Sequence, residues 1–225
     1  EELASGQPSE DAVRAMRRIG SVFPPSSSIL EVGPGMGGLM RLATAKGYRV
    51  QGLELSGFAV QQLLAQGLDV LQGVLPGAEI PAHSVDVVVA IEVIEHLPDP
   101  AAFLREVLRI LKPGGLFYYE TGNVQCEASL RLGAGWDYIM PEGHLYYFSP
   151  RTMRKYLRLT GFDAAYPVWS NPSRLAFRLL HSVGMCDAGE ILPSGLRGRI
   201  CRLVLSIWDR LISANDTFPM AITPR

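Results

Sequence analysis

Short apolar segments alternate with amphipathic segments along most of the chain, and this alternation restricts the possible folds more than any other feature. Apolar runs that predict strands occur at 28–32, 48–55, 68–73, 85–93, 116–121 and 162–168. Segments with helical periodicity lie at 9–23, 38–47, 57–67, 101–115 and 149–161. Short β-branched strands alternating with helices are typical of βαβ units, in which helices cover both faces of a parallel sheet. The sequence therefore predicts a doubly wound α/β fold with a mostly parallel sheet.

Composition supports a folded enzyme-sized domain and argues against several partners. The 225 residues are 48% hydrophobic and 19% charged, which is sufficient for a full core. The net charge of −1 creates no general attraction for nucleic acid. No apolar run reaches membrane-spanning length, no signal peptide opens the chain, and three cysteines lack metal-site spacing. We therefore expect a cytoplasmic protein with reduced thiols.

The pattern changes at two places, which predicts the domain organisation. Residues 122–148 contain Gly, Trp, Tyr and His without a clear period, as expected for a lid over a site. We expect one domain over 1–170, including this lid, and a helical C-terminal appendage over 171–225. A basic, apolar stretch at 196–213 is expected to pack on the domain, with contact to a partner or a membrane surface as the alternative. No oligomeric state is indicated.

A glycine-rich turn, 31-EVGPGMGG-38, joins the first predicted strand to the first helix of the alternating region. Gly33, Gly35 and Gly38 match the G-x-G-x-x-G pattern, and Glu54 ends the second strand about 20 residues further on. Such glycines allow the backbone to approach a ligand closely, and a carboxylate at the second strand can bind ribose hydroxyls. A nicotinamide cofactor and another adenosine ligand both fit this pattern.

Further features distinguish between these cofactors. Glu31 precedes the first glycine, where a carboxylate suits a cofactor with an ammonium group and would be poorly placed beside a pyrophosphate. An apolar fourth strand is entered through Asp86, and the segment 111-LKPGGLFYY-119 follows. With these motifs, the sequence resembles the class I S-adenosylmethionine-dependent methyltransferases of the methyltransferase domain 23 type, over roughly residues 10–168. The resemblance implies a Rossmann-like fold with a seven-stranded sheet, and S-adenosyl-L-methionine as cofactor.

The resemblance also implies roles for individual residues of the cofactor site. Glu31 and the glycine turn would hold the methionine part, Glu54 would accept the ribose hydroxyls, and Leu55 would flank the adenine. Many relatives have an acidic residue for the adenine amino group where this chain has Val74 and Leu75, so we expect backbone groups and apolar packing to bind adenine here. The full expected cofactor set is Glu31, Gly33, Pro34, Gly35, Gly37, Glu54, Leu55, Val74, Leu75, Ile91 and Glu92.

A polar cluster follows the fourth strand, in 91-IEVIEHLP-98. Glu92, Glu95 and His96 lie at the carboxyl end of the sheet, where open α/β folds bind ligands. The cluster resembles the E-x-x-E-H pattern of small-RNA 2′-O-methyltransferases and ubiquinone-pathway O-methyltransferases, in which a later histidine completes a metal site; His144 is the match here.

Three alternatives remain open for this cluster. Glu92, Glu95, His96 and His144 would hold Mg²⁺ or another divalent cation. His96, with Glu95 and His144, would instead act as a metal-free acid/base or position the acceptor. The cluster would otherwise be structural.

These features together predict S-adenosylmethionine-dependent methylation of a small-molecule hydroxyl, on a sugar, a glycan precursor or a secondary metabolite. A nicotinamide-dependent oxidoreductase is disfavoured by Glu31 and by the Lys-Pro-Gly-Gly segment. An RNA methyltransferase is disfavoured by the neutral charge, and no nucleic-acid partner is expected. A relative that binds the cofactor without catalysis also remains open.

Overall fold

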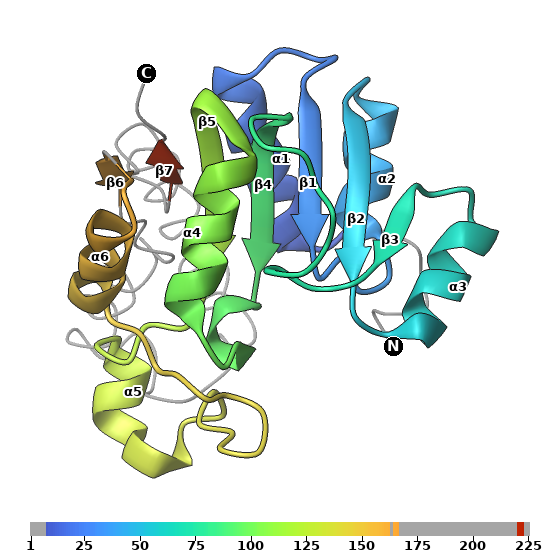
Figure 1. Ribbon diagram of the computed structural model, residues 1–225. Coiled ribbons are helices and arrows are strands. Elements are labelled where there is room, and N and C mark those ends of the chain that lie inside the picture. Colours follow the sequence, from blue (N-terminus) through green and yellow to red (C-terminus); the bar gives the residue numbers. More distant parts are fainter. Residues whose placement is uncertain (1–7, 163, 167–219, 223–225) are drawn as a thin grey trace, which may run out of the picture. The chain divides into compact units, whose positions relative to one another are not determined.

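A central sheet organises the computed structural model, which describes residues 8–162, 164–166 and 220–222 (Figure 1). Five strands pair in parallel in the order β3-β2-β1-β4-β5. They are β1 (Ser28–Val32), β2 (Arg49–Glu54), β3 (Val70–Gln72), β4 (Val85–Ile91) and β5 (Leu111–Glu120). Two three-residue strands, β7 (Met220–Ile222) and β6 (Ala164–Tyr166), continue this order, and β7 runs antiparallel to β5. The predicted α/β class with a parallel sheet is confirmed.

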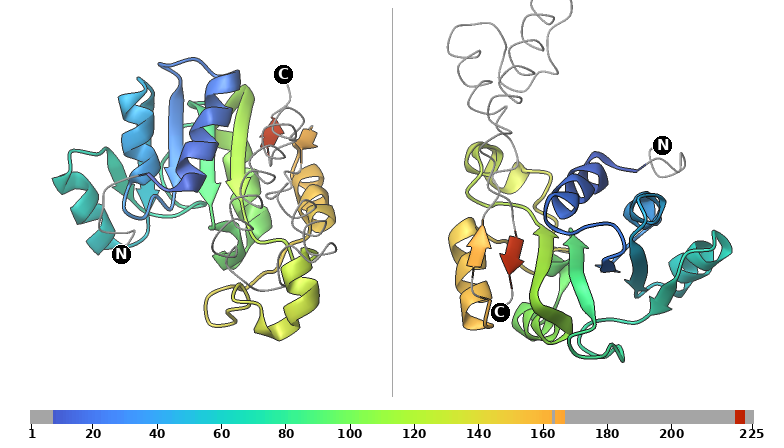
Figure 2. Two further views of the ribbon diagram at one scale, coloured as in Figure 1. Left: turned by 180° about the vertical axis from the view of Figure 1, so that it is seen from behind. Right: turned by 90° about the horizontal axis from the view of Figure 1, so that it is seen from above.

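Helices cover both faces of the sheet (Figure 2). They are α1 (Glu10–Val22), α2 (Gly38–Ala45), α3 (Gly57–Ala65), α4 (Pro100–Ile110), α5 (Glu127–Leu132) and α6 (Pro150–Leu159), with short 3-10 turns η2 (Ile94–His96) and η3 (Gly133–Gly135). Side chains of β4 alternate between the two layers, since successive strand residues point to opposite faces. Val87 and Val89 pack with α1 and α2, whereas Val88 and Ala90 pack with α4 and α6. This two-sided burial explains why β4 is almost wholly apolar.

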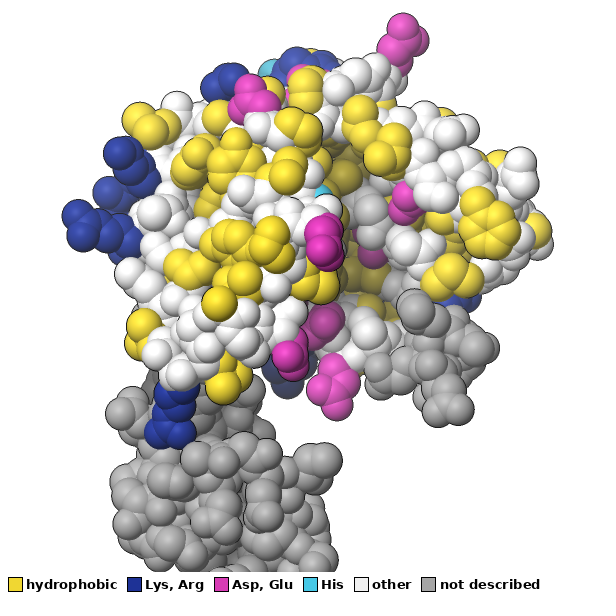
Figure 3. Space-filling model, turned by 90° about the horizontal axis from the view of Figure 1, so that it is seen from below, with side chains coloured by type: hydrophobic (Ala, Val, Ile, Leu, Met, Phe, Trp, Pro, Cys, Tyr) yellow, Lys and Arg dark blue, Asp and Glu magenta, His cyan; other side chains and the backbone are white. Residues whose placement is uncertain are grey.

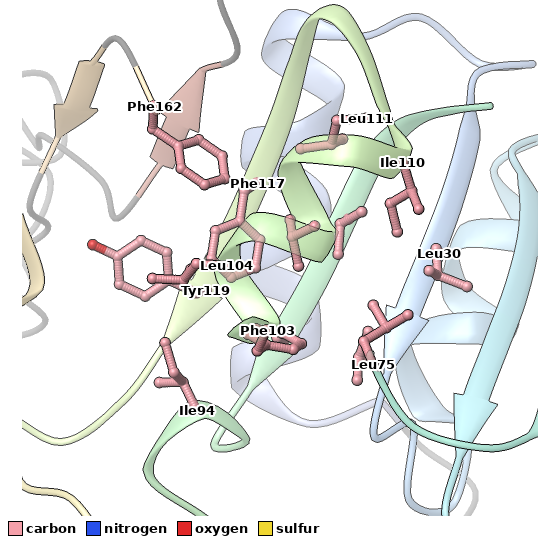
Figure 4. Close-up of a cluster of buried hydrophobic side chains, with 14 of the residues drawn as sticks. Leu30, Leu75, Ile94, Phe103, Leu104, Ile110, Leu111, Phe117, Tyr119 and Phe162 are labelled. Atoms are coloured by element: carbon pink, nitrogen blue, oxygen red, sulfur yellow. The ribbon is translucent and has the colours of Figure 1, made fainter. Parts of the chain in front are cut away.

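Aromatic side chains fill the layer beneath α4. Phe117 of β5 lies between Phe103 of α4 and Phe162, with ring centroids 6.0 and 5.9 Å away, and it stacks on Tyr119 at 5.2 Å (Figure 4). Ile94, in the turn after β4, is also fully buried in this cluster. The core thereby fixes the backbone that carries Glu95 and His96.

Several helix ends use the capping residues that the sequence provides. Ser9 caps α1 by accepting a hydrogen bond from the Ala12 N–H at 3.1 Å. Asp99 caps α4 in the same way, immediately before Pro100. Ser149 begins α6 and forms a capping box with Thr152. These caps set where each helix starts relative to the sheet.

The lid, residues 122–148, leaves the sheet after β5 and returns before α6. An isolated parallel bridge pairs Asn123 with Phe148, and the Val124 N–H donates to the Phe148 carbonyl at 2.9 Å. The two ends of the lid therefore lie side by side. Between them the lid contains α5 and η3, which the aperiodic sequence did not predict.

Two predicted boundaries differ from the structure. Residues 111–115 were assigned to the end of a helix, but they open β5, where the pairing with β4 shifts register between Val85 and Val87. Pro113 has no N–H and Gly114 has a φ of +74°, which suits an irregular strand start as well as a helix end.

The sequence predicts a helical appendage over residues 171–225, but Met220–Ile222 form β7. The predicted helices at 173–184 and 196–213 lie outside the described residues, and the boundary at residue 170 stays a prediction.

None of the helices in the described part of the chain has the length and apolar character that crossing a bilayer requires.

Candidate active site

The carboxyl ends of the parallel strands border a hollow that is lined by apolar and acidic side chains (Figure 3). Ligands of open α/β sheets bind at this edge. The glycine turn, the ends of β2 and β4 and the lid all meet the sheet on this side (Figure 1). Most of the residues predicted to act on ligands are therefore located at one edge.

The glycine turn between β1 and α2 contains three glycines with left-handed backbone, Gly33, Gly35 and Gly37, and two of them also have close neighbours. Gly33 has a φ of +69°, and a Cβ there would lie 2.9 Å from Val93 Cγ2. Gly37, the N-cap of α2, has a φ of +76°, and a Cβ would lie 2.6 Å from Leu63 and 2.7 Å from Leu68. Any larger residue would be strained and would clash. Pro34 is buried within the turn, whereas Gly35 is exposed and has nothing near its Cβ position.

Glu31 is the least compensated acid of the site. Its side chain lies on the same face of β1 as Ile29, is only 6% exposed, and its Oε2 atom has no hydrogen-bond partner. Burial raises the pKa of Glu31 to about 8, although a backbone hydrogen bond from Met40 lowers it in part. A buried carboxylate with an unused oxygen fits a cationic ligand, which would supply the missing partner.

The residues expected around ribose and adenine lie in different environments. Glu54 ends β2, and its Oε1 accepts a hydrogen bond from the Ser56 N–H at 2.8 Å, leaving Oε2 for a ligand. Leu55 is 70% exposed and Val74 is 42% exposed, so both can cover a flat ring. Leu75 is buried beside Leu30 in the core, so its side chain is directed away from this surface (Figure 4).

At the end of β4, Ile91 is partly buried against the α1 and α2 layer, and Glu92 begins the polar cluster. Glu92 has a φ of +51°, uncommon for a residue with a side chain, and its N–H donates to the Glu120 carbonyl at 2.9 Å. Partial enclosure of its carboxyl group and a hydrogen bond shared with Glu95 raise the pKa of Glu92 to about 8. Two carboxyl groups are thus held together at the strand end.

Glu95 is fully buried, and both of its carboxylate oxygens accept hydrogen bonds. The Tyr138 hydroxyl donates to Oε1 at 2.5 Å, and the Thr121 hydroxyl donates to Oε2 at 3.0 Å. The backbone carbonyl of Glu95 also accepts from the N–H groups of Leu145 and Tyr146. The lid is therefore attached to Glu95 at both its side chain and its backbone.

His96 and His144 meet edge to face beside Glu95, with ring centroids 4.7 Å apart. His96 Nδ1 lies 2.8 Å from the Gly143 carbonyl, and His144 Nδ1 lies 2.8 Å from the Tyr138 carbonyl. Because a carbonyl only accepts, each Nδ1 must carry the hydrogen, and each neutral ring keeps a lone pair on Nε2. Metal-binding histidines have this arrangement, in which a backbone carbonyl fixes the ring.

One atom from each of Glu95, His96 and His144 can be chosen so that all three lie within 4.8 Å of one another. Among the described residues, these three form the group that could hold a metal ion, and Glu92 is not part of this group. The sequence predicted these three residues and also Glu92. Within the described residues, the structure thus brings together one carboxylate and two imidazoles.

Sequence reasoning did not find the residues that support this cluster. Tyr138 and Thr121 bind Glu95 from the lid and from the residue after β5. Burial and the hydrogen bond to Glu95 raise the pKa of Tyr138, so its hydroxyl keeps its proton and acts as a donor. Arg14 of α1 pairs with Glu120 at the end of β5, with Nε 3.2 Å from Oε1. Tyrosine in an aperiodic segment and arginine on a helix give no sequence signal for such contacts.

The fold and the site geometry define a class: a Rossmann-like α/β protein with a glycine turn after β1, a buried acid before this turn and a second acid at the end of β2. The family model described as a methyltransferase domain matches residues 6–166. The chain belongs to this family, which confirms the predicted resemblance.

Individual relatives agree with this family. A ubiquinone biosynthesis O-methyltransferase from Xanthomonas axonopodis pv. citri is 31% identical over 175 residues, covering 69% of this chain and 73% of the relative. A protein of the same name from Sodalis glossinidius is 33% identical over 132 residues, covering 56% of this chain and 52% of the relative. The chain thus spans about half the length of the Sodalis protein.

Among solved structures, a SAM-dependent methyltransferase from Archaeoglobus fulgidus superposes with a TM-score of 0.62 at 18% identity, covering 96% of this chain and 95% of that one. At this identity the likeness shows the fold alone.

Proposed function

We propose that this protein transfers the methyl group of S-adenosylmethionine to a hydroxyl oxygen of a small molecule, and that a divalent cation held by Glu95, His96 and His144 assists the transfer. The observation that supports the cation is the pair of histidines beside the buried Glu95. Their Nδ1 atoms donate to backbone carbonyls, which leaves the Nε2 lone pairs available, and one atom from each of the three residues lies within 4.8 Å of the others. Family membership and the relatives named O-methyltransferases support methyl transfer to oxygen.

The cofactor would lie across the ends of β1 and β2. Glu31, in its ionised form, would bind the ammonium group of the methionine part, and Glu54 would accept the ribose hydroxyls. Leu55 and Val74, both exposed, would cover the adenine. S-adenosylmethionine would supply an electron-poor methyl carbon. The acceptor oxygen would bond to this carbon in line with the methyl–sulfur bond, which would break and leave S-adenosylhomocysteine.

The polar cluster would hold the acceptor. A cation bound there would lower the pKa of a coordinated hydroxyl, so that its proton can leave at neutral pH. One carboxylate and two imidazoles favour transition metals such as Mn²⁺ or Zn²⁺ over Mg²⁺. Tyr138 and Tyr147 pack against His144, and Trp136 stacks on Tyr138, so we propose a flat acceptor with adjacent hydroxyls, such as a catechol.

The direct test is methyl transfer from S-adenosylmethionine to a panel of catechols, monophenols and sugars, with and without added Mn²⁺. We expect catechol methylation that stops on chelation with EDTA and returns with Mn²⁺. His144→Gln should remove the metal dependence together with most of the activity. His83→Gln is the matched control, because His83 Nδ1 also lies within hydrogen-bonding distance of a backbone carbonyl, that of Leu111, away from the cluster.

The result of chelation separates the alternatives for the cluster. Full activity after exhaustive EDTA treatment would rule out the cation and leave His96 as a metal-free base or positioning group. Methylation of RNA but of no small molecule would contradict the acceptor class. Binding of S-adenosylmethionine without turnover on any acceptor would indicate a relative that has lost catalysis.

A further inference from the structure

Tyr138 is the lid residue that touches Glu95. Its hydroxyl donates to Glu95 Oε1 at 2.5 Å and accepts from the Gly122 N–H at 2.8 Å. The Thr121 hydroxyl lies 3.2 Å from the same Tyr138 oxygen and binds the second Glu95 oxygen. The Glu95 carboxylate is thus fixed in orientation by two hydroxyls, one of which the lid supplies.

The same residue also orients His144. The Tyr138 carbonyl accepts the hydrogen bond from His144 Nδ1 at 2.8 Å, and the Tyr138 ring packs on the His144 ring with centroids 4.3 Å apart. On its other side the Tyr138 ring stacks on Trp136 at 5.0 Å. Tyr138 therefore contacts two of the three proposed cation ligands, through its hydroxyl, its ring and its backbone.

From these contacts we infer that Tyr138 is a positioning residue, which holds Glu95 and His144 in ligand geometry and fastens the lid to the end of β4. This inference rests on the proposed function, because it assigns a role within the proposed cation site. His144 belongs to the lid, whereas Glu95 belongs to the η2 turn that follows β4, so the ligand set is complete only when the lid is folded onto this turn. Cation binding and lid closure are then linked, and each strengthens the other.

The test uses the full-length chain with Tyr138→Phe, which keeps the ring and the backbone carbonyl and removes only the hydroxyl. Mn²⁺ is titrated while the electron paramagnetic resonance signal of free Mn²⁺ is recorded, and amide hydrogen exchange of residues 122–148 is followed by mass spectrometry. We expect Mn²⁺ affinity to fall by about tenfold or more, as for other residues that orient metal ligands. We also expect faster exchange across the lid, with the melting temperature recorded to confirm folding.

Tyr146→Phe is the matched control, because Tyr146 lies in the same lid and its hydroxyl also donates a hydrogen bond outside the lid, in this case to the Pro98 carbonyl at 3.0 Å rather than to Glu95. It should bind Mn²⁺ as the wild type does. Thr121→Val is a second variant that removes the other hydroxyl from Glu95, and it should also weaken Mn²⁺ binding.

The outcomes separate this inference from the proposed function. If Tyr138→Phe matches Tyr146→Phe in both Mn²⁺ affinity and lid exchange, the inference is wrong while the cation site stands. If the wild type binds no Mn²⁺, the proposed cation is wrong. Faster lid exchange in Tyr138→Phe alone would then still support Tyr138 as the residue that holds the lid on Glu95, and unchanged exchange would overturn that role too.

Discussion

Glu31 combines deep burial with an unused carboxylate oxygen, an arrangement that costs free energy in the absence of a ligand. A positively charged ligand group removes this cost by pairing with the ionised form. Because burial raises the pKa of Glu31 to about 8, the acid is mostly protonated at neutral pH until such a ligand binds. Binding of an ammonium group should therefore release a proton.

The residue-scale prediction concerns this proton. S-adenosylmethionine affinity of the wild type should rise between pH 6 and pH 8, because less free energy is needed to ionise Glu31 as the pH approaches its pKa. Glu31→Gln should bind at least roughly tenfold more weakly at pH 8, since a hydrogen bond to a charged group contributes about 1.5–3 kcal/mol. Its affinity should also lose this pH dependence.

Isothermal titration calorimetry measures both effects, and buffers of different ionisation enthalpy report the released proton. Glu79→Gln is the control, because Glu79 is exposed. Equal affinity of Glu31→Gln and the wild type at pH 8 would exclude Glu31 as the ammonium partner.

Some of the site could be predicted residue by residue and some could not. Glu31, Glu54 and Glu95 follow or end predicted strands, so the fold alone places them near the ligand edge. Tyr138 reaches Glu95 across 43 residues of sequence, from a segment without periodicity. No local sequence pattern predicts such a contact, because the contact depends on how the lid folds back onto the turn after β4.

The β1–α2 turn is the element on which the cofactor site most depends. Gly37 and Gly67 both have left-handed backbone, with φ of +76° and +77°, but only Gly37 lies close to other side chains. The pair therefore separates the cost of backbone strain from the cost of a clash.

The element-scale prediction uses this pair. Gly67→Ala should lower the free energy of unfolding by about 1–2 kcal/mol, the cost of a left-handed residue with a side chain. Gly37→Ala should cost roughly 1–3 kcal/mol more, because its Cβ meets Leu63 and Leu68. Urea unfolding of both variants measures the difference. If the two variants lose the same free energy of unfolding, then Leu63 and Leu68 can move aside without cost, and the close packing around Gly37 does not contribute to stability.

At the same scale, the alternation of strands and helices was sufficient to predict β1 to β5 and the helices between them. It failed where one residue pattern suits two structures. Lys112–Gly115 has the Pro-Gly-Gly composition that ends helices, yet Leu111 already pairs with Val85 in the sheet. Whether such a segment ends a helix or begins a strand depends on its pairing with a distant strand, which local composition does not predict.

For the molecule as a whole, buried acids set how stability depends on pH. Glu31 and Glu92 each have a pKa of about 8 in the folded protein, well above the usual value of a glutamate. The folded state therefore binds more protons than the unfolded state between about pH 4.5 and pH 8, and stability falls as the pH rises through this range. Asp86 affects stability in the opposite direction. Burial raises its pKa, but the hydrogen bonds from Lys112 and Ser28 lower it by more, so the pKa lies below its usual value. The stability that Asp86 contributes is therefore lost as the pH falls into the acid range.

The whole-molecule prediction is a stability maximum on the acidic side of neutrality. The melting temperature of the ligand-free protein should be highest near pH 5 and fall steadily towards pH 8.5. Glu31→Gln should reduce this slope, while Glu79→Gln should leave it unchanged. Differential scanning calorimetry across this range checks the profile. A melting temperature that rises from pH 5 to pH 8 would show that these acids are ionised in the folded protein.

The bridge between Asn123 and Phe148 has a consequence for protein engineering. Because the lid leaves and rejoins the rest of the protein at adjacent points, residues 124–147 can be replaced by another loop whose two ends lie a similar distance apart. Replacing them with the corresponding residues of another family member should alter the choice of acceptor, while the proposed S-adenosylmethionine pocket at the ends of β1 and β2 stays the same. Such a replacement must bring its own equivalents of Tyr138 and His144, so acceptor choice and cation use would be inherited together.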